Sequence, residues 1–327
     1  MIYYFFLITL FLLSLILFKI FINISPRLNL IDKPNSLNMH KIITPTSGGI
    51  IFFIMLTIYF VLIYFFIKKT ILLPNNYLVL LFSIIIIFFI SVYDDMFPIH
   101  AVYKLIFQLL IIYFSLTTIQ IDKIPLPTKL SLIAVLLIWV YLINTINFID
   151  GVDGFLTVFA INFFLIVALV CFKFNYNILS KYFSDIFIII LLSFLIFNKP
   201  EAKLFMGDSG SILLGIIIGY CFLELSILGR WDVMISSILY PIIDCTLTII
   251  KRILNKQAPW ARLFDYYFLK PIKNKKKNNI FIFKTNLIFN LCILITTTIQ
   301  VIYNLKFLLI INILITLFFI NYYKKNS

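Results

Sequence analysis

Long apolar runs alternate along the chain with short stretches that contain charged residues, glycine or proline. Each run has close to the roughly 20 residues that an α-helix needs to cross the hydrocarbon core of a bilayer. The pattern predicts eleven such helices, at residues 2–23, 47–67, 77–93, 100–118, 129–147, 154–172, 183–198, 209–228, 233–253, 281–303 and 306–322. The span at 100–118 has the weakest signal because Lys104 and Gln108 lie in its first turns. Without it ten helices remain, and every later loop changes side.

The composition indicates the same class of protein. Of the 327 residues, 63% are hydrophobic and 12% are charged, and the mean hydropathy is +1.10. A soluble domain could not cover so much apolar surface. We therefore expect one all-α, polytopic integral-membrane domain over residues 1–327. The first span is long and lacks a small-residue cleavage site, so we expect a retained helix rather than a signal peptide. The four cysteines have no paired spacing and are expected to pack in the interior.

Basic residues are distributed unequally between the two sets of predicted loops and span ends. Nineteen lysines and arginines fall on one side and eight on the other. Because cytoplasmic loops carry an excess of Lys and Arg, the larger set predicts the cytoplasmic side, an external N-terminus and a cytoplasmic C-terminus. The formal net charge of +14 then reflects membrane orientation. Nucleic-acid binding is not expected, because there is no separate basic domain.

The predicted cytoplasmic loop near residues 254–280 is both basic and amphipathic. Five apolar and aromatic residues recur there at spacings typical of a helix lying in the headgroup plane: Trp260, Leu263, Phe264, Tyr267 and Phe268. Arg262 and Asp265 would project from the other face and could reach a phosphate ligand. The run from Lys273 to Lys277 is typical of contact with anionic lipid.

Polar clusters interrupt the apolar pattern on the predicted cytoplasmic side. They occupy alternate connections, at His40–Gly49, Asp94–Asp95, Asn144–Gly154 and Gly207–Ser211. Ionised side chains near the bilayer interior are costly, so such residues are read as functional by default. Connections on one face can converge into a single cleft, and a mixture of carboxylates and cations suits a metal ion and a phosphorylated ligand.

The segment Asn144–Gly154 carries the most polar groups. At helical spacing Asn144, Asn147 and Asp150 lie three residues apart on one face, which Asp153 joins if the helix continues. That face could hold a hard cation. The alternative is a loop in which the asparagines and aspartates only cap helices.

Asp94 and Asp95 are adjacent, so on a helix they point about 100° apart and cannot both face one atom. One could contact a metal while the other positions or deprotonates a substrate oxygen. A solvated helix end is the alternative. Lys104 lies in the next span and needs a partner, which Asp95 or a phosphate would supply.

The segment Gly207–Ser211 stands where a span begins. Asp208 or Ser209 is expected to cap that helix, which would leave free amides that favour phosphate. Helix capping without a ligand is the alternative. Asp244, inside the span at 233–253, also needs a partner, and Lys251 or Arg252 is expected to provide it.

Four of these segments, taken in order, resemble the polyprenyl-phosphate N-acetylhexosamine-1-phosphate transferases, the initiating branch of glycosyltransferase family 4. The segments are Thr44-Pro-Thr46-Ser-Gly-Gly49, Asp94-Asp95 followed by Lys104, Asn144-Thr-Ile-Asn147-Phe-Ile-Asp150-Gly-Val-Asp153-Gly154, and Phe205-Met-Gly207-Asp208-Ser-Gly-Ser. The resemblance implies a Mg²⁺-dependent enzyme, with Mn²⁺ as an alternative, that transfers an N-acetylhexosamine 1-phosphate from a UDP-sugar to undecaprenyl phosphate and releases UMP. It also implies a bacterial inner-membrane protein whose active site faces the cytoplasm. The reaction would start the synthesis of a lipid-linked cell-envelope glycan.

The resemblance also assigns roles to residues. Asn147 and Asp208 would hold the metal ion, Asp94 and Asp95 would orient or deprotonate the lipid phosphate, and Lys104 would offset charge. The substrate-binding set would be Lys41, Thr46, Asp150, Asp153, Phe205 and Arg262.

Two departures from the family pattern affect the substrate. Many relatives carry a histidine cluster in the last cytoplasmic loop, but this chain has no histidine between Lys251 and Lys284. That argues against the pentapeptide-carrying branch and favours a GlcNAc-like or modified N-acetylhexosamine donor. Leu37 stands where a basic residue is common. The exact sugar, lipid length, pathway and oligomeric state, including a homodimer, stay open.

Two other classes of function predict different patterns. A transporter or lipid flippase would place its polar groups near mid-membrane in broken helices, often in repeated halves, which this sequence does not show. A CDP-alcohol phosphotransferase would use membrane-edge aspartates and Mg²⁺, but with a different spacing of aspartate and glycine.

Overall fold

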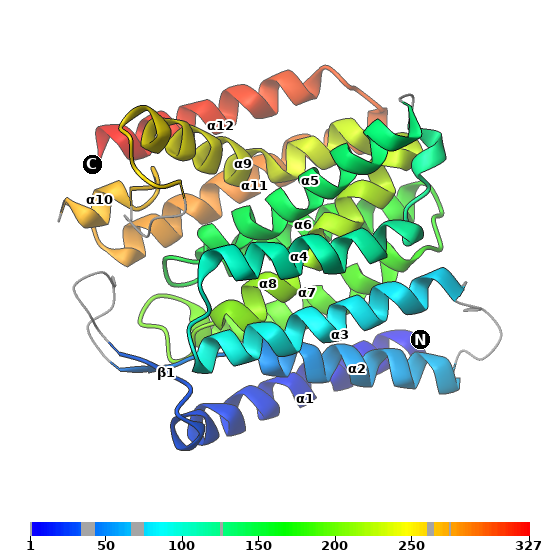
Figure 1. The fold of residues 1–327 in the computed structure, drawn as a ribbon, viewed down its shortest axis with the longest axis horizontal. Helices are drawn as coiled ribbons and strands as arrows, with labels where there is room; N and C mark the ends of the chain where they lie inside the picture. The colour runs from blue at the N-terminus through cyan, green and yellow to red at the C-terminus, as the bar shows by residue number, and fades with distance from the viewer. Residues whose placement is uncertain (1, 34–42, 67–74, 125–126, 260–264, 275) are drawn as a thin grey trace.

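The computed structural model describes residues 2–33, 43–66, 75–124, 127–259, 265–274 and 276–327. In these ranges the chain forms a bundle of long helices with broadly aligned axes (Figure 1). The strands found there are two residues each, β1 (Ile31–Asp32) and β2 (Thr44–Pro45), paired antiparallel with Ile31 opposite Pro45. The predicted all-α class is therefore confirmed.

Eleven long helices and one short helix make up the described bundle. They are α1 (Ile2–Ile24), α2 (Gly49–Phe66), α3 (Asn75–Met96), α4 (Ala101–Ser115), α5 (Thr128–Phe148), α6 (Phe155–Lys173), α7 (Leu179–Asn198), α8 (Gly207–Leu225), α9 (Trp231–Leu254), α10 (Lys270–Lys273), α11 (Asn279–Tyr303) and α12 (Leu308–Lys325). Short 3₁₀ turns lie at Ser25–Leu28, Leu116–Thr118 and Ile121–Lys123, and a π-helical turn at Ser226–Arg230 joins α8 to α9. Each predicted span coincides with one long helix to within four residues at either end.

The helices suit a multi-pass membrane protein. Over the described ranges, nine helical segments are long and apolar enough to cross a bilayer, and one of them is the continuous α8–α9 segment from Gly207 to Leu254. Helix α2 is equally apolar but shorter. The two chain ends lie at opposite ends of the bundle (Figure 1). The exact number of spans and the side that each terminus faces stay predictions.

Helix α8 forms the centre of the bundle. Its residues from Ser209 to Cys221 are all buried, as expected for a helix that is apolar on every side. Small residues allow the neighbouring α5 to approach closely: a Cβ on Gly215 would lie 2.8 Å from the Cα of Ile143. Trp139 of α5 adds a hydrogen bond from its Nε1 to the carbonyl of Ile216, at 2.9 Å. This packing fixes the polar end of α5 beside the start of α8.

The starts of α2 and α8 are also in close contact. The backbone N–H groups of Gly48 and Gly49 donate to the carbonyls of Phe205 and Met206, each at 3.0 Å. A Cβ on Gly49 would lie only 2.1 Å from the backbone nitrogen of Gly210. Position 49 therefore has no room for a side chain, and the two helix starts are held together by backbone contact.

Replacing Gly49 with alanine is expected to separate α2 from α8 and to cost about 1–3 kcal/mol or more of stability, because backbone cannot move aside as a side chain can. Gly151→Ala is the matched control, since its Cβ would meet the Leu269 side chain at 3.6 Å and the Phe268 ring at 3.8 Å, both ordinary contacts. Thermal unfolding of the purified variants in detergent measures the difference. Equal melting temperatures for the two variants would contradict the close contact.

Candidate functional site

The acidic end of α3 meets the first turn of α8. Asp95 Oδ1 accepts a hydrogen bond from the backbone N–H of Asp208 at 2.7 Å. Asp95 Oδ2 accepts from the backbone N–H of Ser209 at 3.2 Å and from the hydroxyl of Ser47 at 2.7 Å. Asp95 thus caps α8 from another helix, where a negative charge is favoured by the exposed amides and the helix dipole.

This contact corrects one expectation from the sequence. Asp208 or Ser209 was expected to cap α8 and leave amides free for phosphate, but the amides of both residues donate to Asp95. Gly207, with φ of +72°, makes the turn into α8, and a Cβ there would lie 2.7 Å from Asp95 Oδ2. The absence of a side chain at Gly207 therefore allows Asp95 to approach the start of α8 closely.

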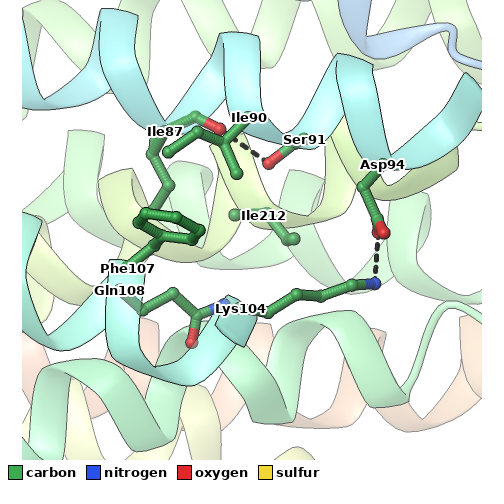
Figure 2. Close-up of a pocket in the computed structure, with 8 residues that line it drawn as sticks. All are labelled: Ile87, Ile90, Ser91, Asp94, Lys104, Phe107, Gln108 and Ile212. Carbon is green, nitrogen blue, oxygen red and sulfur yellow. Dashed lines mark hydrogen bonds and ion pairs between the residues drawn. The ribbon is translucent and has the colours of Figure 1, made fainter. Parts of the chain in front are cut away.

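Lys104 of α4 lies between two carboxylates. Its Nζ pairs with Asp94 Oδ2, a contact visible in Figure 2, and lies 2.8 Å from Asp208 Oδ2. Asp94 Oδ1 also accepts from the backbone N–H of Ile99 at 2.7 Å. Of the two partners predicted for Lys104, Asp95 or a phosphate, Asp95 is not the one found, because adjacent side chains on α3 diverge and Asp95 faces α8. Helices α3, α4 and α8 together form this charged cluster.

The two asparagines at the end of α5 face α4 and α8. Asn147 Oδ1 accepts from the hydroxyl of Ser211 at 3.0 Å, which places Asn147 beside the first turn of α8 that carries Asp208. Asn144 Nδ2 donates to Gln108 Oε1 at 2.6 Å. The predicted shared face is present as far as Asn147. It stops there, because α5 ends at Phe148 and Asp150 belongs to the following loop.

Asp150 brings an additional negative charge to this end of the bundle. Burial raises the pKa of its carboxyl to about 7, and the negative charges of Asp208, Asp95 and Asp153 contribute to the rise. Within the described ranges its carboxylate has no hydrogen-bond donor. Carboxylates therefore outnumber the ammonium of Lys104 around the start of α8, and a bound cation would relieve the imbalance.

Asp153 is held by contacts with the loop after α7 and with the start of α11. Its Oδ2 accepts from the backbone N–H groups of Glu201 and Ala202, at 3.2 and 3.4 Å, and from Asn279 Nδ2 at 3.3 Å. These contacts connect the loop after α7 to the start of α11. A role of Asp153 in substrate binding stays a prediction.

The remaining predicted substrate-binding residues lie at the same end of the bundle or outside the described ranges. Thr46 donates its backbone N–H to the carbonyl of Leu30, and Phe205 donates its own to Pro45, at 3.0 and 2.8 Å. The segment after β2 is thereby held beside the loop that leads into α8. Lys41 and Arg262 lie outside the residues that the structure describes.

The last loop is anchored by a buried arginine. Arg252, 1% exposed, donates from Nε to Asp265 Oδ1 at 3.1 Å and from Nη1 to the Pro259 carbonyl at 2.7 Å. Asp265 is therefore engaged by Arg252, and the expectation that it projects toward a phosphate is wrong. A buried guanidinium requires a carboxylate partner, which here comes from the loop rather than from α9.

Asp244 is satisfied without either predicted cation. Its carboxylate accepts from the Tyr240 hydroxyl at 3.0 Å and from the backbone N–H groups of Tyr267 and Phe268 at 2.9 and 3.3 Å. Phe268 is fully buried and stacks on Phe155, with ring centroids 4.3 Å apart. The expected position of Phe268 in the headgroup plane is therefore wrong. Three residues of the expected amphipathic helix, Trp260, Leu263 and Phe264, lie outside the described ranges.

The donor atoms at this site suit Mg²⁺. In the described part of the chain, no three histidine, cysteine, aspartate or glutamate side chains form a metal-binding group by themselves. Mg²⁺, however, is usually held by one or two carboxylates together with substrate phosphates and water. Asp208, the Asn147 amide oxygen and the unpartnered carboxylate of Asp150 are hard oxygen donors of this kind. The residues therefore fit an ion that is bound jointly with a phosphorylated substrate.

Three contact residues were not singled out from the sequence. Ser47 and Ser211 lie within recognised segments, but their partners belong to other helices. Gln108 was noted only as a polar interruption of an apolar span. A buried amide in such a span is itself a signal, because it needs a partner inside the bundle.

Comparison with known proteins identifies similar sequences. The sequence model of glycosyl transferase family 4 matches residues 77–226, which include Asp94, Asp95, Lys104, Asn147 and Asp208. A "probable undecaprenyl-phosphate N-acetylglucosaminyl 1-phosphate transferase" of Bacillus subtilis (strain 168) is 34% identical over 188 residues, which is 51% of this chain and 50% of that protein.

Two further relatives carry related names. A phospho-N-acetylmuramoyl-pentapeptide-transferase of Staphylococcus carnosus (strain TM300) is 30% identical over 45% of this chain and 44% of that protein. A decaprenyl-phosphate N-acetylglucosaminephosphotransferase of Mycolicibacterium smegmatis is 28% identical over 43% of this chain and 39% of that protein. The chain spans about half the length, or less, of these curated relatives.

Proposed function

Because the sequence model of glycosyl transferase family 4 matches residues 77–226, we propose that this chain is a member of that family, transfers an N-acetylhexosamine 1-phosphate from a UDP-sugar to a polyprenyl phosphate and releases UMP. The observation that carries this proposal is the charged cluster of Asp94, Lys104 and Asp208, with Asp95 on the start of α8, at one end of a bundle of apolar helices. A cluster of this kind can meet both a water-soluble anion and a lipid phosphate. The three relatives named above are all sugar-phosphate or phospho-sugar transferases by name, and none is named as a transporter or a CDP-alcohol phosphotransferase.

The reaction joins two anions, so the site must first reduce their repulsion. An oxygen of the lipid phosphate forms a bond to the β-phosphorus, the bond from that phosphorus to the bridging oxygen breaks, and UMP leaves with the oxygen. Mg²⁺, held by Asn147 and Asp208, would neutralise charge on the diphosphate. Lys104 would donate to an incoming phosphate and keep the adjacent carboxylates from repelling it.

The contacts support different roles for the two adjacent aspartates. Both oxygens of Asp95 accept hydrogen bonds from Ser47 and from α8, so Asp95 acts as a positioning residue for Asp208. Asp94 lines the pocket next to Lys104 and is better placed to orient or deprotonate the lipid phosphate. Lys41, Thr46, Asp150, Asp153, Phe205 and Arg262 remain the proposed substrate-binding set.

The location of the protein is part of the proposal. We place it in the bacterial inner membrane with the charged cluster facing the cytoplasm. The excess of basic residues on the predicted cytoplasmic loops supports that orientation. A fusion of a reporter to the C-terminus, which should be cytoplasmic, tests it.

A UMP-release assay tests the proposed reaction. The purified protein in detergent is given undecaprenyl phosphate, Mg²⁺ or Mn²⁺, and one of a panel of donors: UDP-GlcNAc, UDP-GalNAc and UDP-MurNAc-pentapeptide. We expect release with a UDP-N-acetylhexosamine, dependent on both lipid and metal, and none with the pentapeptide donor. The relatives named for N-acetylglucosamine support the first donor. Silence with every donor would overturn the proposal.

Asp150 gives the site a predicted pH dependence. With a pKa of about 7, its carboxyl is protonated in acid and ionised above neutrality. A bound divalent cation favours the ionised form, so metal affinity should rise up to about tenfold per pH unit below neutrality and level off above it. Mn²⁺ titrations across this range measure the slope. Asp150→Asn should flatten the slope of metal affinity against pH, whereas Glu201→Gln, at an exposed position of the same end of the bundle, should not. Equal slopes in wild type and Asp150→Asn would contradict the assignment of this pH dependence to Asp150.

A further inference from the structure

Gln108 is a buried amide inside a predicted membrane span. It lies one helical turn beyond Lys104 on α4 and is only 3% exposed. Its Oε1 accepts a hydrogen bond from Asn144 Nδ2 at 2.6 Å. Asn144 Nδ2 also donates to the carbonyl of Val140 at 2.8 Å, so the Asn144 amide cannot flip without losing both bonds. The orientation of the Gln108 amide is therefore fixed from α5.

The other end of this amide points into the site. With Oε1 directed toward Asn144, Nε2 lies on the side of Lys104 (Figure 2). In the described ranges no acceptor is bonded to Nε2. Since Gln108 lines the pocket, its Nε2 donors are available to a ligand that brings an acceptor oxygen. Gln108 is thus an oriented, unpaired donor within a pocket that already contains an ion pair.

The pocket around Gln108 combines a polar mouth with apolar walls. Asp94 and Lys104 lie at one end, and the hydroxyl of Ser91 is already used, donating to the Ile87 carbonyl at 2.7 Å. The walls come from three helices: Ile87 and Ile90 of α3, Phe107 of α4 and Ile212 of α8 (Figure 2). The lining thus offers charged and apolar contacts side by side, the combination that an anionic group attached to an apolar chain would use.

We propose that Gln108 Nε2 donates a hydrogen bond to a phosphate oxygen of the lipid acceptor and so selects and positions that substrate. This inference rests on the proposed function. The lipid, rather than the sugar nucleotide, is the expected partner because Gln108 lies about 6 Å deeper along α4 than Lys104, four residues at 1.5 Å each. A uridine diphosphate sugar has no apolar segment to place against Ile87, Ile90 and Phe107. A neutral amide also costs less at that depth than a second ammonium.

Three variants of Gln108 separate recognition from packing. Gln108→Glu keeps an oxygen for Asn144 but replaces the donor with an acceptor. Gln108→Leu removes donor and acceptor without adding charge, and Gln108→Asn retains a donor on a shorter side chain. Ser115→Ala, a buried position further along α4 whose hydroxyl bonds only its own helix at Ile111, is the control for general disturbance of the helix.

Kinetic constants for both substrates provide the first readout. Gln108→Leu should raise the KM for undecaprenyl phosphate, expressed as mole fraction in the micelle, by about 10- to 100-fold, the value of one hydrogen bond to a charged group. Gln108→Glu should raise it further, and Gln108→Asn less. The KM for the UDP-sugar should change less than about threefold. Equal rises in both KM values would show a packing role and overturn the inference, as would an unchanged lipid KM.

Lipid binding provides a readout that does not require turnover. Native mass spectrometry can compare binding of undecaprenyl phosphate with undecaprenol, which has the same chain without phosphate. Wild type and Ser115→Ala should prefer the phosphate form by at least about tenfold, and Gln108→Leu should lose most of that preference. A wild-type protein that shows the preference but transfers no sugar would contradict the proposed function and leave this inference supported. Wild type without a preference, or Gln108→Leu with an intact one, would overturn the inference.

Discussion

Asp208→Asn is expected to lower turnover by about 10³-fold or more while the protein stays folded and still binds the nucleotide. Asparagine keeps the size of the side chain and one oxygen, so the packing at the start of α8 changes little. It removes the negative charge that pairs with Lys104 at 2.8 Å and that would hold a divalent cation. Losses of about 10²–10³-fold follow removal of a single preorganised electrostatic contact, and a metal ligand adds to that.

The fold should tolerate this change for a reason visible in the contacts. Lys104 keeps Asp94 as a partner, and the backbone N–H of Asp208 still donates to Asp95. The expected loss therefore appears in kcat, whereas the melting temperature and UDP-sugar binding change little. This split distinguishes loss of a reacting group from loss of structure.

Glu201→Gln is the matched control for Asp208→Asn. It removes one acidic charge at an exposed position of the same end of the bundle, outside the cluster of Asp94, Lys104 and Asp208. UMP release and calorimetric binding of UDP-GlcNAc are measured for both variants. Turnover of Asp208→Asn within about tenfold of wild type would remove Asp208 from the proposed metal site, because a metal ligand cannot be neutralised at so small a cost.

The membrane helices were predictable from the sequence for a physical reason. Inside a bilayer every backbone polar group must be bonded within its own segment, so each crossing appears as a continuous apolar run. The span at 100–118 had the weakest signal because of Lys104 and Gln108, yet α4 forms there. Its two polar residues are accommodated by partners on other helices, at Asp94 and Asp208 for the lysine and at Asn144 for the glutamine.

The partners of polar side chains were less predictable, because they depend on which helices lie side by side. Lys104 was expected to pair with Asp95 or a phosphate, and Asp244 with Lys251 or Arg252; the predicted protein partners are those close in sequence. The structure instead gives Asp95 to the start of α8, and gives Asp244 to the backbone of Tyr267 and Phe268. Sequence spacing identifies that a buried charge needs a partner, but only the packing of α3, α4, α8 and the last loop decides which partner it finds.

The same contacts bring together polar clusters that are far apart in sequence. Asp95 joins α3 to α8, Asn147 joins α5 to α8, and Gln108 joins α4 to α5. Helix α8 is central, so each cluster that touches its first turn is brought to one place. The predicted convergence of these residues is therefore confirmed by geometry, whereas their roles in catalysis remain proposals.

Lys104→Met is expected to destabilise the protein strongly in the absence of divalent cations. Removing the ammonium leaves the carboxylates of Asp94 and Asp208, which are 5% and 20% exposed, without their shared partner. Breaking a buried ion pair in this way typically costs about 3–5 kcal/mol, because the remaining charge is not compensated. The melting temperature in EDTA should fall, and lipid-dependent turnover should be lost. Lys203→Met, at an exposed position of the same end, should melt like wild type.

Mg²⁺ should partly restore the stability of Lys104→Met. In wild type the ammonium already neutralises Asp208, so a cation must compete with Lys104 for that carboxylate; in the variant the cation meets no competitor. A ligand at about 100 times its Kd stabilises the folded state by about 2.7 kcal/mol, so the Mg²⁺-dependent rise in melting temperature should be larger for Lys104→Met than for wild type. Equal shifts in the two proteins would mean that Mg²⁺ and Lys104 do not share Asp208, and the metal would then have to be bound by other oxygen donors.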